Sequence, residues 1–83
     1  MTDAGGVRVQ LLGKPGCHLC DDARAVIAAV CAEMGVEWSD RDLTQFPDEL
    51  ARWWDMVPVT LVDGAVHDYW RVEPDRLRAA LTG

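Results

Sequence analysis

The feature that most constrains this chain is a pair of cysteines, Cys17 and Cys20, placed where a strand pattern gives way to a helix pattern. The apolar residues 7–12 precede the pair, and apolar residues at helical spacing follow it. A thiol in the first turn of a helix faces unsatisfied backbone N–H groups and the positive end of the helix dipole. Both favour the thiolate, which is the form that attacks disulfides. The pattern therefore predicts a redox-active dithiol, with Cys17 at the cap as the more exposed thiol.

The composition limits what kind of protein carries this dithiol. The 83 residues suffice for one domain but not two, and a hydrophobic fraction of 49% suits a compact core. A net charge of -6, with only 8 scattered basic residues, argues against nucleic acid and membranes as partners. Residues 1–6 lack the basic and apolar regions of a signal peptide. We expect a cytoplasmic monomer, with residues 1–6 frayed or disordered and residues 7–83 forming a single domain.

The cysteine count leaves two interpretations of the pair open. Three cysteines are too few for a disulfide-stapled secreted domain, and elsewhere a C-x-x-C pair is more often catalytic or metal-binding. Zinc normally takes four ligands, whereas Cys31 lies about 16 Å along the same expected helix from Cys20. We therefore expect no metal within one chain and treat Cys31 as a buried core thiol. The alternative is a non-catalytic module that binds an Fe–S cluster through a dimer, or a redox-linked protein adaptor.

Hydrophobic spacing and turn residues predict the order of the elements. Strands are expected over residues 7–12, 36–43, 58–62 and 65–71, and helices over residues 17–34 and from residues 47 and 74 onward. Asp63-Gly64 is a two-residue hairpin signal, which makes the last two strands antiparallel. The long helix is a right-handed crossover, which makes the first two strands parallel. The sequence predicts an α/β protein of order β-α-β-α-β-β-α, with a mixed four-stranded sheet and helices on both faces.

Spacing also assigns side chains to the core. In the second helix Leu50, Trp53 and Trp54 form the inward stripe, although adjacent residues lie about 100° apart, so we expect one tryptophan to be partly exposed. His67, on the last strand, is expected at the surface. The inward residues of the first and third helices are Ala23, Val26, Ile27, Val30, Cys31 and Met34, and Leu77, Ala80 and Leu81.

Two motifs, Lys14-Pro15-Gly16-Cys17-His18-Leu19-Cys20 and Val57-Pro58, carry a resemblance to a known family. In this order and before a β-hairpin, they resemble the small glutaredoxin-like proteins of the thioredoxin fold, from about residue 7 to residue 82. The resemblance implies a thiol–disulfide oxidoreductase in which Cys17 forms the mixed disulfide and Cys20 resolves it. It also implies that Pro58 is the family's cis-proline beside the dithiol, and that the backbone of Val57 pairs with an extended substrate.

The same resemblance suggests how substrate is bound. Lys14 matches the family's basic residue that approaches a carboxylate of glutathione. His18 replaces the first of the two residues, Pro-Tyr, that the family carries between its cysteines, and its imidazole either stabilises the Cys17 thiolate or points to solvent. Where the family has a Gly-Gly pair followed by an acidic pair, this chain has Tyr69 and Arg71. These differences weaken the usual glutathione pocket, and Tyr69 or Arg71 is expected to border the site instead.

The expected partners follow from this chemistry. The substrate is a disulfide-containing protein or a small thiol compound, and the reductant is glutathione or a reductase. No cofactor is expected to be bound. Glutathione stays an open co-substrate, because the residues that would hold it match the family only in part.

Overall fold

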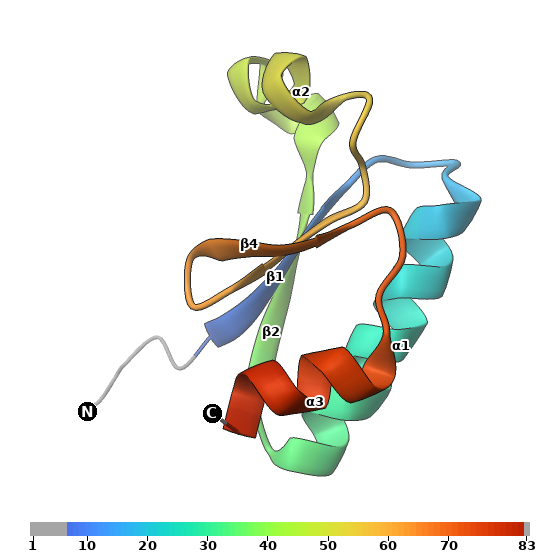
Figure 1. The fold of residues 1–83 in the computed structure, drawn as a ribbon. Helices are drawn as coiled ribbons and strands as arrows, with labels where there is room; N and C mark the ends of the chain where they lie inside the picture. Colours follow the sequence, from blue (N-terminus) through green and yellow to red (C-terminus); the bar gives the residue numbers. More distant parts are fainter. Residues whose placement is uncertain (1–6, 83) are drawn as a thin grey trace.

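The computed structural model describes residues 7–82, which form four strands and three α-helices (Figure 1). The expectation for residues 1–6 lies outside the described residues. A short 3-10 helix, Leu43–Gln45, follows the second strand. The strands are β1 (Val7–Gly13), β2 (Glu37–Asp42), β3 (Val59–Val62) and β4 (Ala65–Tyr69), and the α-helices are α1 (His18–Met34), α2 (Pro47–Trp53) and α3 (Pro74–Thr82).

The four strands form one sheet in the order β2-β1-β3-β4. β1 is parallel to β2 and antiparallel to β3, and β3 is antiparallel to β4. The predicted mixed sheet is confirmed, with apolar β1 in the interior and the more polar β2 at an edge. Asp63 and Gly64 take φ angles of 51° and 84° in the β3–β4 turn. A two-residue hairpin of the primed type needs positive φ at both positions, so the Asp-Gly signal is confirmed as well.

Buried side chains form two clusters on opposite faces of the sheet. Successive residues of a strand point to opposite faces, so Leu11 enters the first cluster and Leu12 the second. The first lies under α1 and α3 and consists of Val9, Leu11, Ala23, Ile27, Val30, Cys31, Val72, Leu77 and Leu81. The second lies toward α2 and consists of Leu12, Cys20, Leu43, Val57 and Val59. Helices therefore cover both faces, as predicted, and Cys31 is the buried core thiol that its spacing indicates.

Three side-chain assignments were wrong or only partly right. Helix α2 buries none of its residues completely. Trp53 is half-buried and Trp54 is 61% exposed, so the inward placement of Trp54 was wrong, whereas the expectation that one of the two tryptophans is exposed is confirmed. Ala80 is only half-buried. His67 is not a plain surface residue, since its Nε2 is buried without a hydrogen-bond partner among the described residues. It is the extra residue of a bulge opposite Thr60 and Leu61, which interrupts the regular alternation of side chains along β4.

Two strands end earlier than their patterns predict. β2 stops at Asp42 because the Asp42 carboxylate accepts the backbone N–H of Thr44 at 2.9 Å, which starts the 3-10 helix. β4 stops at Tyr69 because Trp70 takes a φ of 64°, outside the extended region. Within residues 7–82 no helix has the length and apolarity needed to cross a membrane.

Replacing Leu77 with Ala tests how α3 is held. Leu77 is fully buried in the first cluster, so the Leu77→Ala variant should lose about 2–5 kcal/mol of unfolding free energy, measured by urea denaturation. The adjacent Arg76 is exposed and pairs with Asp68 at 3.1 Å, so Arg76→Ala should cost less than about 1 kcal/mol. Similar losses in the two variants would contradict this packing of α3.

Candidate active site

Cys17 caps the first helix. The chain leaves β1 at Gly13 and turns into α1 through Gly16, whose φ of 73° lies in the left-handed region that glycine adopts readily. Cys17 is the N-cap residue, with φ -104° and ψ 113°, and its Sγ accepts a hydrogen bond from the backbone N–H of Cys20 at 3.2 Å. This donor and the helix N-terminus both stabilise negative charge on the sulfur. The predicted position of Cys17 at the cap is confirmed.

Cys20 differs from Cys17 in its access to water. Both are free thiols, but Cys17 is half-buried whereas Cys20 is completely buried. Burial, followed by the contact with the Cys17 side chain, raises the pKa of Cys20 to about 11, against a smaller opposing effect of the Lys14 backbone. Near neutral pH Cys20 is therefore a protonated inner thiol beside an outer thiol that solvent can reach. This arrangement suits a dithiol that exchanges in two steps. The outer sulfur can reach a substrate disulfide, and the inner sulfur stays protonated until the second step.

Gly13 makes room for the inner thiol, and sequence reasoning missed it. A Cβ atom at Gly13 would lie 3.0 Å from the Sγ of Cys20 and 3.4 Å from its Cβ. The absence of a side chain at residue 13 therefore lets the end of β1 approach the first turn of α1 without displacing Cys20. The available signal was a glycine directly before the cysteine loop, but a glycine there is equally expected for turn formation alone.

The segment before β3 lies against the dithiol. The peptide bond between Val57 and Pro58 is cis, as the resemblance implies. Val57 belongs to the same buried cluster as Cys20, and Cys17 packs against this cluster. The carbonyl of Pro58 accepts the N–H of Trp70 at 2.6 Å. The main chain of Val57 makes no hydrogen bond to another of residues 7–82, although the residue is only 8% exposed.

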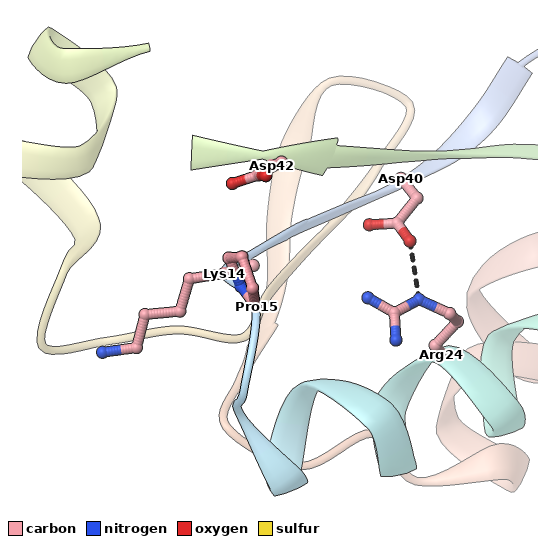
Figure 2. A pocket seen from close by; sticks show the side chains of 6 residues that line it. Lys14, Pro15, Arg24, Asp40 and Asp42 are labelled. Atoms are coloured by element: carbon pink, nitrogen blue, oxygen red, sulfur yellow. Dashed lines mark hydrogen bonds and ion pairs between the residues drawn. The ribbon is translucent and has the colours of Figure 1, made fainter. Parts of the chain in front are cut away.

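Lys14 provides a cation on the loop that leads from β1 to α1 (Figure 2). It lines a hollow of about 320 Å³ together with Arg24, Asp40 and Asp42. Arg24 donates to Asp40 at 2.6 Å, so its charge is compensated there. The Lys14 side chain points away from these carboxylates in Figure 2, and within residues 7–82 it forms no ion pair. Lys14 is therefore available to an anionic group.

The remaining residues predicted for the site lie around the same helix start. Tyr69 is half-buried and packs against the cluster that holds Cys20. Arg71 is exposed and lines a second hollow together with Leu19, which lies between the two cysteines. His18 is exposed, and its side chain makes no hydrogen bond within the described part of the chain. Trp70 lines the same hollow as Arg71 and is a further candidate for the site. The sequence did not reveal its unusual backbone conformation, a φ of 64°.

The mixed sheet, the dithiol at the start of α1 and the cis-proline before β3 together define a protein of the thioredoxin fold. A family model described as "Glutaredoxin-like domain (DUF836)" matches residues 8–82. The chain belongs to this family of glutaredoxin-like domains.

Relatives and solved structures agree with this assignment. Uncharacterized proteins of Mycobacterium tuberculosis and Mycobacterium bovis are 35% identical over 77 residues, which cover 87% of this chain and 79% of theirs. A structural-genomics target from X. campestris has a TM-score of 0.73 at 25% identity, over 89% of this chain and 95% of that one. The holo form of glutaredoxin C1 from Populus tremula x tremuloides has a TM-score of 0.50 at 17% identity, over 92% of this chain and 75% of that one. The last similarity concerns the fold alone.

Gly13→Ala should destabilise the protein through Cys20. The added methyl group would lie too close to the Cys20 Sγ, and overpacking of this kind costs about 1–3 kcal/mol of unfolding free energy. In a Cys20→Ala background the same substitution should cost less, because the sulfur is gone. Denaturation of the two single variants and the double variant measures this coupling. An equal cost of Gly13→Ala in both backgrounds would show that Cys20 is not the obstacle.

The raised pKa of Cys20 predicts a loss of stability at high pH. In the unfolded chain Cys20 ionises near its ordinary value of 9.0, whereas in the folded protein it stays protonated to about 11. The unfolded state therefore binds fewer protons in this range, and the stabilisation, complete below pH 9, is lost as pH rises toward 11. Urea unfolding of the reduced protein at pH 8 and pH 10.5 should show this fall. The Cys20→Ala variant should show a smaller fall, and an unchanged one would contradict the assignment.

Proposed function

We propose that this protein is a thiol–disulfide oxidoreductase that uses Cys17 and Cys20 as its dithiol. The difference between the two thiols is the observation that carries the proposal. Cys17 caps α1, receives a backbone hydrogen bond on its sulfur and reaches solvent. Cys20 is buried directly behind it and has a pKa of about 11. A merely structural cysteine pair has no need of this division into an outer and an inner thiol.

The proposed reaction proceeds in two exchange steps. The Cys17 thiolate attacks one sulfur of a substrate disulfide, a new S–S bond joins Cys17 to the substrate, and the other substrate sulfur leaves as a thiolate that takes up a proton. Cys20 then loses its proton and attacks the Cys17 sulfur. The second substrate thiol leaves, and the Cys17–Cys20 disulfide forms. Two electrons pass from the dithiol to the substrate, so an external thiol or a reductase must restore the reduced pair.

The surroundings of the dithiol support a substrate-binding role for the residues that the sequence singled out. In this proposal the main chain of Val57, beside Pro58, pairs with an extended substrate segment. Lys14 offers a positive charge to a carboxylate, and Arg71 lies on the other side of the cysteine loop. Tyr69 fills part of the space beside the thiols. His18 is exposed next to Cys17, where it is free to contact either solvent or substrate.

The substrate, the reductant and the cellular compartment form part of the same proposal. The substrate is a protein disulfide or a small disulfide, and the reductant is glutathione or a reductase, with no resident cofactor. An odd number of cysteines and a dithiol that must be re-reduced both suit the reducing cytoplasm. The rival interpretation, an Fe–S cluster held between two subunits, uses the same Cys17 thiolate. It predicts a coloured dimer after anaerobic reconstitution with iron and sulfide, whereas the redox proposal predicts a colourless monomer.

Substitution of each cysteine should separate the two steps. With 2-hydroxyethyl disulfide as substrate, Cys17→Ser should lower turnover by about 100-fold or more, because the attacking thiolate is lost. Cys20→Ser should instead accumulate a mixed disulfide on Cys17, visible as a mass increase that reductant reverses. Cys31→Ala serves as the control and should keep its turnover, since Cys31 lies in the other cluster. Undiminished turnover in the Cys17→Ser variant would overturn the proposed function.

A further inference from the structure

Trp70 has a backbone conformation that tryptophan rarely adopts. Its φ of 64° lies in the left-handed region, where a bulky side chain is an outlier and glycine is the usual residue. Two short hydrogen bonds hold it there: its N–H donates to the Pro58 carbonyl at 2.6 Å, and the next N–H, of Arg71, donates to the Tyr69 carbonyl at 2.7 Å. Such outliers cluster at functional sites, where neighbouring structure maintains them. The presence of tryptophan at a position that favours glycine therefore calls for a reason in its side chain.

The indole ring of Trp70 is held in place and yet faces solvent. Its Nε1 donates to the Asp55 carbonyl at 3.3 Å, and its ring lies 6.0 Å from the Tyr69 ring at an angle of 51°. The side chain nevertheless remains 49% exposed. A core residue would be buried, and a residue needed only for the turn would be glycine. A ring that is held in one position and is half-exposed offers a preformed apolar surface to another molecule.

A hollow lies between Trp70 and the start of α1, and it is lined by Leu19, the residue before Cys20. Leu19, Ala23 and Val26 of α1 line one side of it, and the segment from Trp70 to Glu73 lines the other. Its volume of about 180 Å³ is below the roughly 300–1,000 Å³ of pockets that enclose a whole small ligand, and suits a single side chain. Asp22 and Glu73 contribute negative charge and Arg71 positive charge. The carboxylates outnumber the guanidinium, so the effect of apolar contact is isolated by comparing uncharged occupants.

We propose that Trp70 is a specificity-determining residue for the dithiol, and that its substrate is a protein disulfide in an extended segment. The main chain of this segment pairs with Val57, and an apolar or aromatic side chain next to the substrate cysteine enters the hollow against the Trp70 indole. Leu19 lines the hollow and lies between the two cysteines in the sequence, so in this proposal the side chain in the hollow belongs to a residue close to the sulfur that Cys17 attacks. This assignment rests on the proposed function and adds to it a preference for an apolar or aromatic side chain next to the substrate cysteine.

Single-turnover reduction by the pre-reduced protein tests the assignment, because the dithiol then supplies both electrons. Three substrates are compared: 2-hydroxyethyl disulfide and two uncharged peptide disulfides that differ only in Phe or Gly next to the cysteine. The wild-type protein should reduce the Phe peptide with a second-order rate constant about 10-fold or more above that for the Gly peptide, which is the scale of discrimination by one apolar contact. With Trp70→Gly this preference should fall to about 1-fold to 2-fold, while the rate with 2-hydroxyethyl disulfide stays within about twofold.

Two further variants separate the ring from the fold. Trp70→Phe keeps an aromatic ring without the Nε1 donor and should retain part of the preference. Trp54→Ala removes a tryptophan that is more exposed, at 61%, and that makes no hydrogen bond through its side chain within residues 7–82. It should keep the full preference for the Phe peptide. A loss of preference in Trp54→Ala equal to that in Trp70→Gly would assign the effect to exposed aromatic area in general and overturn the proposal.

The remaining outcomes distinguish this inference from the proposed function. Equal rates for both peptides in the wild-type protein would overturn the role of Trp70 but leave the dithiol chemistry intact. A Trp70→Gly variant that loses the same factor on all three substrates would show a structural role instead. A wild-type dimer that Trp70→Gly dissociates, seen by sedimentation, would show that a second copy occupies the surface and also overturn it. Failure to reduce even 2-hydroxyethyl disulfide would overturn the proposed function itself.

Discussion

The hydrogen bond from the Cys20 N–H to the Cys17 Sγ is the interaction around which this small protein is arranged. It satisfies one of the free N–H groups at the start of α1 and at the same time directs a donor at the outer sulfur. Serine or aspartate normally fills such a cap, so structural and chemical requirements coincide in one side chain here. The geometry also places the second thiol one helical turn inward, where burial and not charge governs its ionisation.

The second buried cluster determines what surrounds this bond. Leu12 comes from β1, Cys20 from α1 and Val57 from the segment before β3, and Tyr69 packs against them from β4. These residues are distant in sequence, and they meet at one end of the sheet. Gly13 lets the end of β1 approach α1 without displacing Cys20, and the position of the segment after β4 depends on the hydrogen bond between Trp70 and the Pro58 carbonyl. A small cluster thus connects the inner thiol to the surface where a substrate would lie.

Local patterns predicted most of the fold because each rests on neighbouring residues. The spacing of apolar residues in α1, the Asp63-Gly64 turn and the alternation in the strands all act within about ten residues of chain, and the sheet order follows once the crossover is right-handed. The same approach also indicated that only one of the two adjacent tryptophans of α2 can face the sheet, and Trp54 is the exposed one. It did not predict the environment of His67, because His67 is the extra residue of a bulge in β4.

For the site, the sequence by itself determined which atoms are the candidates for the proposed chemistry: two sulfurs three residues apart at a helix start, with Val57-Pro58 opening a later strand. These are properties of local spacing, and folding does not change them. Only the tertiary structure decided that Cys20 is fully buried, that Gly13 lies against the Cys20 side chain and that Trp70 lies in the left-handed region with its ring half-exposed. Each of these depends on contacts between segments that meet only when the sheet forms. The local patterns around these three residues did not contain such contacts, whereas helical spacing was enough to place Cys31 in the core.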